Sequence, residues 1–319
     1  LHDYAKQYQN FEIMFHANVK ELGPGRQLLV SHEQNQIEVN AKVILASDGR
    51  FSTVKRLGQF ENQYDHHDLD VVWFILKRPE NYKHFFSFFL GLNSAYLILP
   101  KHPNQLQCGM VFRPGEFLKL KKKGIEAFKK KLSRGHPLFV EFSKGVTDFS
   151  NFHLLKGNRA LVKKWVNDGV VLIGDAAHTC SPAGGIGVAI ACETAIVAAK
   201  NIIDGLRKGD LSDRHIGKIQ NKRLRQIKNV HLIQGQARFM LNPLLLPLRL
   251  FIPLVVPIIS FLKIIPLFAR RILAQQVSFG GEYPDELVVR DALEVYFKRS
   301  GFSRKTYTDA WIHLPFGPF

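Results

Sequence analysis

A strand, a glycine-rich loop and a long helix are expected to follow one another within Val170–Ile203, and this order constrains the fold most. The apolar run at 170–173 predicts a short buried strand, which ends at Gly174 and Asp175. A loop of small residues follows, and the alanine-rich run 188–203, without Pro or Gly, predicts a helix. Glycines let a backbone approach a ligand, and a helix start offers unpaired N–H groups. The stretch therefore indicates a nucleotide-type ligand site or, alternatively, an ordinary strand–loop–helix connection.

A second predicted strand also ends in an acidic residue beside a glycine. The apolar run 42–46 is typical of a buried, parallel strand, and it is followed by Asp48 and Gly49. Ser52 is a suitable N-cap for a short helix over 53–57. Carboxylates at two strand ends can accept hydrogen bonds from the ribose or ribityl hydroxyls of one extended ligand. Each carboxylate could equally form an Asx turn or a helix cap.

The composition indicates a globular protein in a reducing compartment. A length of 319 residues suits one large domain or a few smaller ones, and an apolar fraction of 46% excludes a disordered chain. The three cysteines form no C-x-x-C pair, which argues against a disulfide framework and a structural zinc site. We therefore expect a cytoplasmic protein without a metal. Residues 1–20 show no signal-peptide pattern, and the start at Leu1 suggests a fragment or a processed chain.

Lysine and arginine cluster in two segments, 119–134 and 214–228, within a chain of net charge +17. Three interpretations stay open: solvated helix faces, an anionic membrane surface, or a nucleic-acid surface. Neither segment carries interleaved aromatic residues or a recognition motif, so we expect no nucleic-acid partner. Within the first cluster, 124–134 predicts a basic amphipathic helix.

The character of the chain changes over 60–158, where short β-prone segments alternate with turn residues. The segments 71–76, 85–90, 96–99 and 106–112 predict a mostly antiparallel sheet. Its aromatic side chains could line an apolar pocket or simply form a core; they are Trp73, Phe74, Phe85, Phe86, Phe88 and Phe89.

The segment 241–268 is very apolar but is interrupted by five prolines. Its longest charge-free piece, 250–262, is too short to span a bilayer, so we predict no transmembrane helix there. We expect a packed helical cap or, alternatively, a surface that touches a membrane or an apolar partner.

The residues around both strand ends resemble the motifs of one flavoprotein family. Gly174-Asp175-Ala176-Ala177-His178, followed by Pro182 and by Gly-Gly-Ile-Gly at 184–187, resembles the second flavin fingerprint of the FAD-dependent aromatic hydroxylases (the p-hydroxybenzoate hydroxylase-like flavoprotein monooxygenases). Ser47-Asp48-Gly49-Arg50, with Ser52 and Val54-Lys55, is similar to the internal D-G motif of that family. The motifs stand in the order of the family, and the resemblance covers about 1–280.

The resemblance implies FAD as the cofactor and NAD(P)H as the co-substrate. Asp175 would hold the sugar hydroxyls on the flavin side, whereas Asp48 and Arg50 would lie near the pyrophosphate and the approach of the nicotinamide. The helix that starts at Val188 would stabilise the negative charge of a reduced flavin. The other cofactor-binding residues expected from the resemblance are Gly49, Gly174, Pro182, Gly184, Gly185, Ile186 and Gly187.

The sequence departs from the family pattern at several positions. No G-x-G-x-x-G turn precedes Lys42, so the first βαβ unit, which receives the pyrophosphate in the family, is expected to be missing. Ala189 replaces an asparagine beside the flavin. Thr194 stands in place of an acidic residue, with Glu193 just before it.

Two residues of the flavin stretch could be structural or chemical. His178 matches the histidine of the family and could be catalytic or a satisfied structural imidazole. Cys180 is interpreted as a small buried thiol rather than a nucleophile, because no base is evident beside it in the sequence. We single out no catalytic residue.

We therefore predict an α/β fold: an incomplete Rossmann-like FAD-binding domain with an inserted, mostly antiparallel β-sheet substrate domain and a C-terminal helical segment. The FAD-binding domain is expected at 1–59 and 159–235, the substrate-binding sheet at 60–158, and an apolar, basic extension at 236–319.

The predicted function is that of an FAD-dependent monooxygenase, which uses NAD(P)H and O2 to hydroxylate an apolar, aromatic small molecule. Two alternatives stay open: a flavin-dependent reductase or dehydrogenase of a prenyl-type lipid, and a truncated remnant without activity. Peripheral contact with the inner face of the membrane through 241–268 is a further option. We make no prediction of the oligomeric state.

Overall fold

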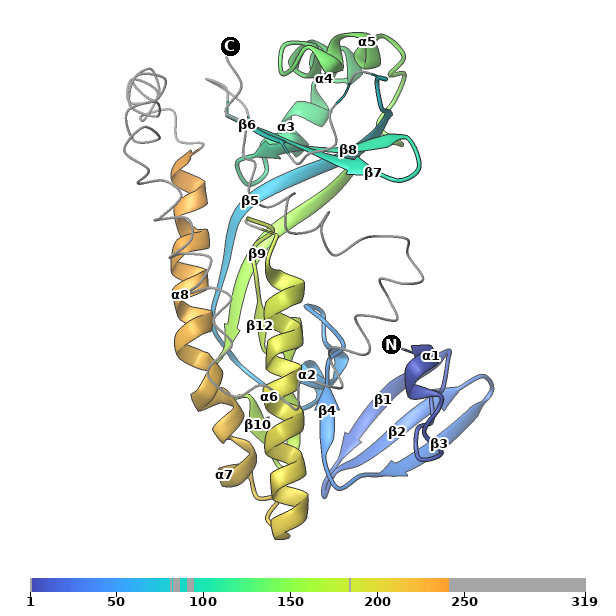
Figure 1. The fold of residues 1–319 in the computed structure, drawn as a ribbon, viewed down its shortest axis with the longest axis vertical. Coiled ribbons are helices and arrows are strands. Elements are labelled where there is room, and N and C mark those ends of the chain that lie inside the picture. The colour runs from blue at the N-terminus through green and yellow to red at the C-terminus, as the bar shows by residue number, and fades with distance from the viewer. Residues whose placement is uncertain (1, 81, 83–86, 91–94, 184, 241–319) are drawn as a thin grey trace. The chain divides into compact units, whose positions relative to one another are not determined.

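The computed structural model describes residues 2–80, 82, 87–90, 95–183 and 185–240 (Figure 1). Their contacts divide into two compact units, one made of 2–66 and 159–231 and the other of 67–158 and 232–240. The chain passes between these units within the long strands β5 (Asn62–Lys77) and β9 (His153–Val162).

The first unit contains two small sheets. Helix α1 (His2–Ala5) precedes an antiparallel meander of β1 (Ala17–Gly23), β2 (Gln27–His32) and β3 (Asn35–Asn40). The second sheet has the order β10-β11-β4, formed by Val166–Asn167, Val170–Leu172 and Ile44–Ala46. Strand β11 runs antiparallel to β10 and parallel to β4. The predicted strands at 42–46 and 170–173 are thereby confirmed.

Besides α1, the described part of the first unit contains several helical elements. They are α2 (Thr53–Leu57), the 3-10 turn η1 (Gly174–Ala176), α6 (Gly187–Lys208), α7 (Asp213–Ile216) and the first part of α8 (Lys218–Met240). Apolar residues of β4, β11 and α6 share one buried core, so the sheet and α6 are packed together.

The predicted helix over 188–203 is confirmed but is longer than expected. It continues to Lys208 and ends at Gly209, whose φ of 69° suits the left-handed cap of a helix. Gly205 lies inside the extension because a Cβ there would stand 2.6 Å from the carbonyl oxygen of Asp210. This close approach lets the chain fold back directly after the helix.

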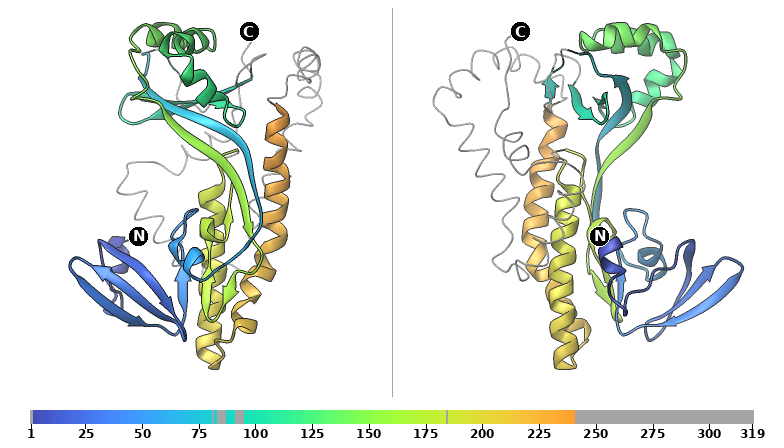
Figure 2. Two further views of the ribbon diagram at one scale, coloured as in Figure 1. Left: turned by 180° about the vertical axis from the view of Figure 1, so that it is seen from behind. Right: turned by 45° about the vertical axis from the view of Figure 1, so that its right-hand side comes forward.

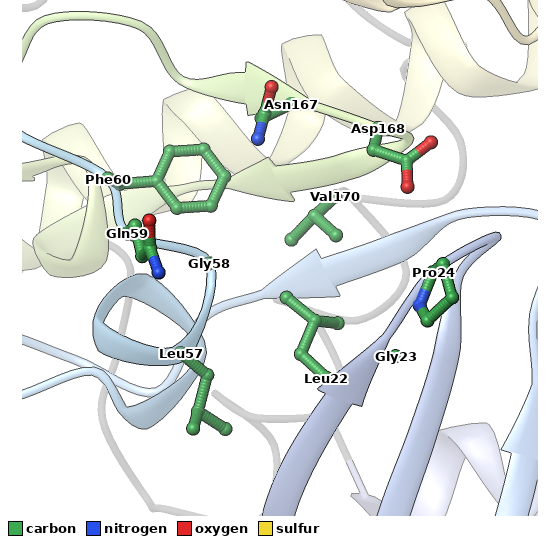
Figure 3. Close-up of a pocket in the computed structure, with 10 residues that line it drawn as sticks. All are labelled: Leu22, Gly23, Pro24, Leu57, Gly58, Gln59, Phe60, Asn167, Asp168 and Val170. Carbon is green, nitrogen blue, oxygen red and sulfur yellow. The ribbon is translucent and has the colours of Figure 1, made fainter.

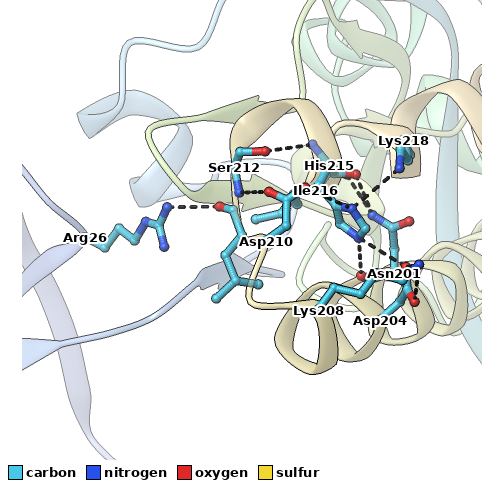
Figure 4. Close-up of polar contacts among 10 residues, drawn as sticks. Arg26, Asn201, Asp204, Lys208, Asp210, Ser212, His215, Ile216 and Lys218 are labelled. Carbon is cyan, nitrogen blue, oxygen red and sulfur yellow. Dashed lines mark hydrogen bonds and ion pairs between the residues drawn. The ribbon is translucent and has the colours of Figure 1, made fainter.

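Polar contacts fix the corner between α6 and α7 (Figure 4). The amide of Asn201 donates a hydrogen bond to the carbonyl oxygen of the buried His215 at 2.9 Å. Arg26, which precedes β2, donates from Nη2 to the carbonyl oxygen of Leu211 at 3.0 Å. The N–H groups of Asp168 and Gly169 donate to Asp213 at 2.9 and 2.8 Å, so α7 is tied to the turn between β10 and β11.

The second unit is built on the predicted antiparallel sheet. Strands β6 (Ser87–Leu90), β7 (Ala95–Lys101) and β8 (Gln105–Phe112) join β5 in the order β5-β8-β7-β6. Beyond β5 the sheet continues to β9 and to β12 (His178–Thr179). The helices α3 (Glu116–Lys122), α4 (Ile125–Ser133) and α5 (Leu138–Lys144) belong to this unit and share a buried core with its strands.

The aromatic side chains of the second unit are mainly core. Phe74 is 1% exposed and packs with Phe139, Phe142 and Phe152. Trp73 lies on the opposite face of β5, beside Gly109, whose missing side chain leaves room for the indole. Phe85 and Phe86 lie outside the described residues, as does the side chain of Phe88, whereas Phe89 is 38% exposed. The amphipathic helix predicted at 124–134 is confirmed as α4, with Phe128 and Leu132 buried.

The predicted C-terminal extension and the apolar segment 241–268 lie outside the described residues, apart from the end of α8. In the part that the structure describes, every helix is too short or too polar to cross a bilayer.

Candidate functional site

The two predicted strand ends lie side by side. Strands β4 and β11 pair in parallel with Ala46 opposite Leu172, and the N–H of Ile173 donates to the carbonyl oxygen of Ala46 at 3.0 Å. Asp48 and Asp175 therefore follow the same edge of the sheet, where the carboxyl ends of parallel strands meet. This edge is where open α/β sheets usually bind ligands.

Asp175 is half-buried in the turn η1 and lies within electrostatic range of Arg50. Burial raises the pKa of the Asp175 carboxyl, and the positive charge of Arg50 counteracts part of that shift. Within the described residues the Asp175 carboxylate accepts no hydrogen bond, so its oxygens are available to a hydroxyl-bearing ligand. The guanidinium of Arg50 also lies 5.0 Å from the ring centre of Phe51, which is 87% exposed.

Asp48 caps the short helix α2, which is one of the structural roles that the sequence allows for this carboxylate. Its Oδ2 accepts a hydrogen bond from the N–H of Val54 at 3.2 Å. The predicted N-cap Ser52 accepts from the N–H of Lys55 at 2.8 Å, which confirms the short helix α2. Between them, Gly49 has a φ of 82°, and a Cβ there would meet no atom within 4 Å. The backbone at Gly49 is therefore open to a ligand.

The loop before α6 is open in the same way. The N–H of Gly185 donates to the carbonyl oxygen of Pro182 at 3.0 Å, which closes a turn; Gly184 lies outside the described residues. Gly185 has a φ of 64° with no atom within 4 Å of a built Cβ. The apolar N-cap residue Ile186 offers no side-chain hydrogen bond to the first N–H groups of α6, and Val188 is 78% exposed. An uncapped, accessible helix start is suited to negative charge.

His178 is a structural residue in this fold. It is 1% exposed, and its Nε2 lies 2.9 Å from the hydroxyl of Thr194. That hydroxyl donates to the carbonyl oxygen of Ile190 at 3.0 Å, so the imidazole must donate to it. Burial lowers the pKa of His178 to about 3, and the ring is neutral at physiological pH. Nε2 is therefore held in a structural hydrogen bond, whereas Nδ1 is buried without a partner among the described residues, so the imidazole is only partly satisfied.

Two residues at which the sequence departs from the family pattern, Glu193 and Thr194, form hydrogen bonds with side chains of α8. Glu193 accepts from Nη2 of Arg223 at 2.7 Å and from the amide of Gln226 at 3.0 Å. Nε of Arg223 also donates to the hydroxyl of Thr194 at 3.3 Å. Arg223 is 3% exposed, so the basic cluster 214–228 is not simply a solvated helix face.

Cys180 has a histidine beside it, contrary to the expectation from the sequence. Its Sγ lies 3.7 Å from Nε2 of His231, whose Nδ1 lies 2.8 Å from the hydroxyl of Tyr64. Burial raises the pKa of the Cys180 thiol to about 12, so the sulfur stays protonated at neutral pH. His231 lies 51 residues from Cys180 on α8, and no sequence pattern connects them. In the described part of the chain, no group of acidic, histidine and cysteine residues could hold a metal.

A cavity of about 210 Å³ lies elsewhere in the first unit (Figure 3). The residues around it come from the end of β1, the end of α2 and the turn between β10 and β11. Because Val170 begins β11, this cavity adjoins the start of the strand rather than the end that carries Asp175. It is separate from the predicted flavin site.

Gly174→Ala should lower the free energy of unfolding by about 1–2 kcal/mol. Gly174 has a φ of 55°, and a Cβ would lie 3.3 Å from the Cβ of Ala191 in α6. Urea unfolding measures the effect. Gly187→Ala is the matched control, since its Cβ would make only an ordinary contact with Cys180 at 3.7 Å. Equal losses in both variants would contradict a special backbone requirement at Gly174.

Comparison with known proteins identifies related sequences and folds. The family model described as FAD binding domain matches residues 4–230. The chain is 27% identical over 227 residues to 6-methylpretetramide 4-monooxygenase of Streptomyces rimosus, a match that covers 70% of this chain and 54% of that protein. The chain therefore spans about half the length of this curated relative.

Two solved structures illustrate the shared fold. OxyS anhydrotetracycline hydroxylase from Streptomyces rimosus superimposes with a TM-score of 0.62 at 17% identity, covering 86% of this chain and 54% of that chain. PqsL, a probable FAD-dependent monooxygenase from Pseudomonas aeruginosa, gives a TM-score of 0.58 at 16% identity over 71% and 64% of the two chains. The predicted mixed α/β fold class is confirmed by this likeness.

Proposed function

The chain belongs to the FAD binding domain family, and from this we propose that it forms the flavin-facing part of an FAD-dependent monooxygenase. The observation that carries the proposal is the meeting of Asp48-Gly49-Arg50 and Gly174-Asp175 at one edge of the parallel pair β4–β11. A Cβ on Gly174 would lie 3.3 Å from the Cβ of Ala191 near the start of α6, so this edge adjoins the uncapped helix start, as a site for a long, anionic, hydroxyl-rich ligand requires.

The residues present fit FAD. Asp175 would accept hydrogen bonds from sugar hydroxyls, while Arg50 and the backbone at Gly49 would lie toward the phosphates. The loop at Pro182, Gly184, Gly185, Ile186 and Gly187, with Val188, would lie along the flavin ring. FAD would supply the two-electron chemistry with NAD(P)H and the reaction with O2. The protein would orient the ring, place the positive end of α6 near its negative charge and exclude water.

We propose that the substrate is an apolar, aromatic small molecule bound by the sheet of the second unit. The relative from Streptomyces rimosus is named as a 4-monooxygenase of 6-methylpretetramide, and OxyS as a hydroxylase of anhydrotetracycline. In this chain Trp73 stands on the face of β5 turned away from the aromatic core, with its indole packed against Gly109. An indole in that position is suited to stack on a planar ring.

Asp175→Ala should reduce the FAD content of the protein expressed from its complete reading frame at least about tenfold, because a charged acceptor of hydroxyl hydrogen bonds is lost. Flavin absorbance per mole of purified protein is the measurement. Asp204→Ala is the control, since Asp204 lies near the other end of α6 and pairs with Lys208. Unchanged flavin content in the Asp175 variant would remove this residue from the proposed site.

The reaction itself is tested with a panel of phenolic and polycyclic aromatic compounds. We expect NADH or NADPH oxidation that depends on substrate, together with one atom of labelled oxygen from ¹⁸O₂ in the product. Substrate-dependent NAD(P)H oxidation without label would instead support the flavin-dependent reductase or dehydrogenase. A colourless protein from the complete reading frame would support the inactive remnant.

A further inference from the structure

The two basic segments of the sequence differ in where the fold places their charges. In 214–228, Arg223 turns inward and pairs with the buried Glu193 at 2.7 Å. The segment 119–134 covers most of α3 and α4 and keeps its charges on the outside of the second unit. Six of its cations are exposed: Lys119, Lys121, Lys122, Lys123, Lys130 and Arg134. The helices α3 and α4 therefore present a dense basic surface.

The packing of α3 and α4 fixes which of their sides face outward. Phe117 of α3 and Phe128 of α4 lie in the same buried core, and their ring centres are 5.9 Å apart. Glu116 of α3 also pairs with Lys131 of α4 at 3.6 Å, so the two helices lie side by side. The six exposed cations therefore gather on the outer side of one helical pair, which we call the basic surface.

The cations of the basic surface are not compensated by neighbouring acids. The two carboxylates of these helices are already engaged, since Glu116 pairs with Lys131 and Arg113. Glu126 pairs with Lys129 at 3.0 Å. Among the described residues, none of the six exposed cations forms an ion pair. Like charges at this density repel one another, so a partner that supplies negative charge relieves the repulsion.

An exposed leucine lies among these cations and indicates the kind of partner. Leu118 is 45% exposed, and Lys121 and Lys122 follow it by three and four positions, on the same face of α3. Lysines around an exposed apolar side chain are typical of a surface that lies on the headgroups of an anionic bilayer. A single-stranded nucleic acid usually stacks its bases on exposed aromatic rings, whereas Phe117 and Phe128 are buried.

We propose that the basic surface of α3 and α4 binds a membrane surface that contains anionic phospholipids. About four to eight lysines or arginines beside an amphipathic helix attract such a surface, and the basic surface has six. Leu118 enters the headgroup region, while the lysine side chains keep their ammonium groups at the lipid phosphates. The attraction is electrostatic and acts within about 8 Å at physiological ionic strength.

One consequence of this binding rests on the proposed function. Apolar, aromatic small molecules partition into bilayers, so a monooxygenase held at a membrane surface would meet its substrate there. The binding itself does not involve flavin, because the basic surface belongs to the second unit, whereas Asp48 and Asp175 belong to the first. Vesicle binding and flavin content are therefore measured separately, and either proposal can fail without the other.

The test is co-sedimentation of the full chain with vesicles, either of phosphatidylcholine alone or of equal parts of phosphatidylcholine and phosphatidylglycerol. We expect binding to the anionic vesicles to be at least about tenfold stronger, and to be lost in about 0.5 M NaCl. Lys121→Glu combined with Lys122→Glu should weaken it at least about tenfold, because two attractions become repulsions. Leu118→Ser should weaken it about threefold, because an apolar side chain no longer enters the headgroups.

Lys77→Glu combined with Lys101→Glu is the matched control, since it changes the net charge of the chain by the same amount. Both lysines are exposed and lie opposite Gln105 in the sheet of the second unit. The start of α3 lies at the other end of the paired part of β5, where the N–H of Gly115 donates to Asp70 at 2.8 Å. The control should alter vesicle binding by no more than about twofold.

Four results would overturn the inference. They are equal binding to neutral and anionic vesicles, an equal loss in the Lys77 and Lys101 control, and no loss with Leu118→Ser, which would indicate a purely electrostatic adsorption. The fourth is a Lys121 and Lys122 variant that loses binding to RNA but keeps its binding to anionic vesicles, which would identify a nucleic acid as the partner.

Discussion

Arg223→Ala is expected to lower the free energy of unfolding by about 3–5 kcal/mol, because it leaves a carboxylate buried without its partner. Arg223 and Glu193 are each 4% exposed in their side chains and lie 2.7 Å apart. Removal of the guanidinium also takes a hydrogen bond from the hydroxyl of Thr194, which in turn accepts from His178. The destabilisation would therefore extend to α6, the helix that follows the proposed flavin loop. Urea denaturation, followed by circular dichroism, measures it.

Two further variants distinguish the stability lost by breaking the buried ion pair from the stability lost by removing any positive charge. Arg225→Ala changes an exposed arginine on the same helix and should alter stability by no more than about 0.5 kcal/mol. The double variant Glu193→Leu with Arg223→Met should recover most of the stability, since apolar residues of similar size can replace a buried pair at little cost. A double variant as unstable as Arg223→Ala would show that the loss does not come from the unpaired carboxylate.

The stability of the chain should fall in acid more steeply than that of its His178→Gln variant. The folded protein holds His178 with a pKa of about 3, whereas an unfolded chain gives histidine a pKa near 6.5. Between these values the unfolded state binds the extra proton. The contribution of the neutral imidazole is therefore complete above pH 6.5 and is lost as the pH falls toward 3.

The expected difference in slope is about 1.4 kcal/mol per pH unit, which corresponds to one proton. Glutamine can still donate to the Thr194 hydroxyl, so the comparison removes the titration and keeps the hydrogen bond. Urea unfolding at several pH values between 4 and 6 gives both slopes. Parallel lines for the two proteins would mean that His178 is not held neutral by the fold.

Local sequence patterns were enough to predict the two parallel strands and the long helix. Apolar runs ended by acid–glycine pairs predicted β4 and β11, and an alanine-rich run predicted α6. Two acids at the ends of predicted strands suggested one shared ligand, and the parallel register of β4 with β11 places both acids after the same edge of the sheet. These inferences needed only information that lies within a few residues of each motif.

The contacts that the sequence did not reveal join distant segments. Arg223 lies 30 residues from Glu193, and His231 lies 51 residues from Cys180. Both partners come from α8, whose basic composition favours a solvated face when it is considered alone. Only the packing of α8 against α6 and Cys180 buries the charge of Arg223 and brings His231 next to the thiol. The two-residue strand β12 is likewise too short for any periodicity to show.

The way in which the second unit is inserted has a consequence for the evolution of such chains. Residues 67 and 158 belong to β5 and β9, which are neighbours in one sheet. The chain therefore enters and leaves the second unit through adjacent strands. An insertion with closely spaced ends can be lengthened, shortened or exchanged without disturbing the pairing of β4 with β11. Under the proposed function, a change of substrate would then require substitutions in the second unit and not at the β4–β11 edge that carries Asp48 and Asp175.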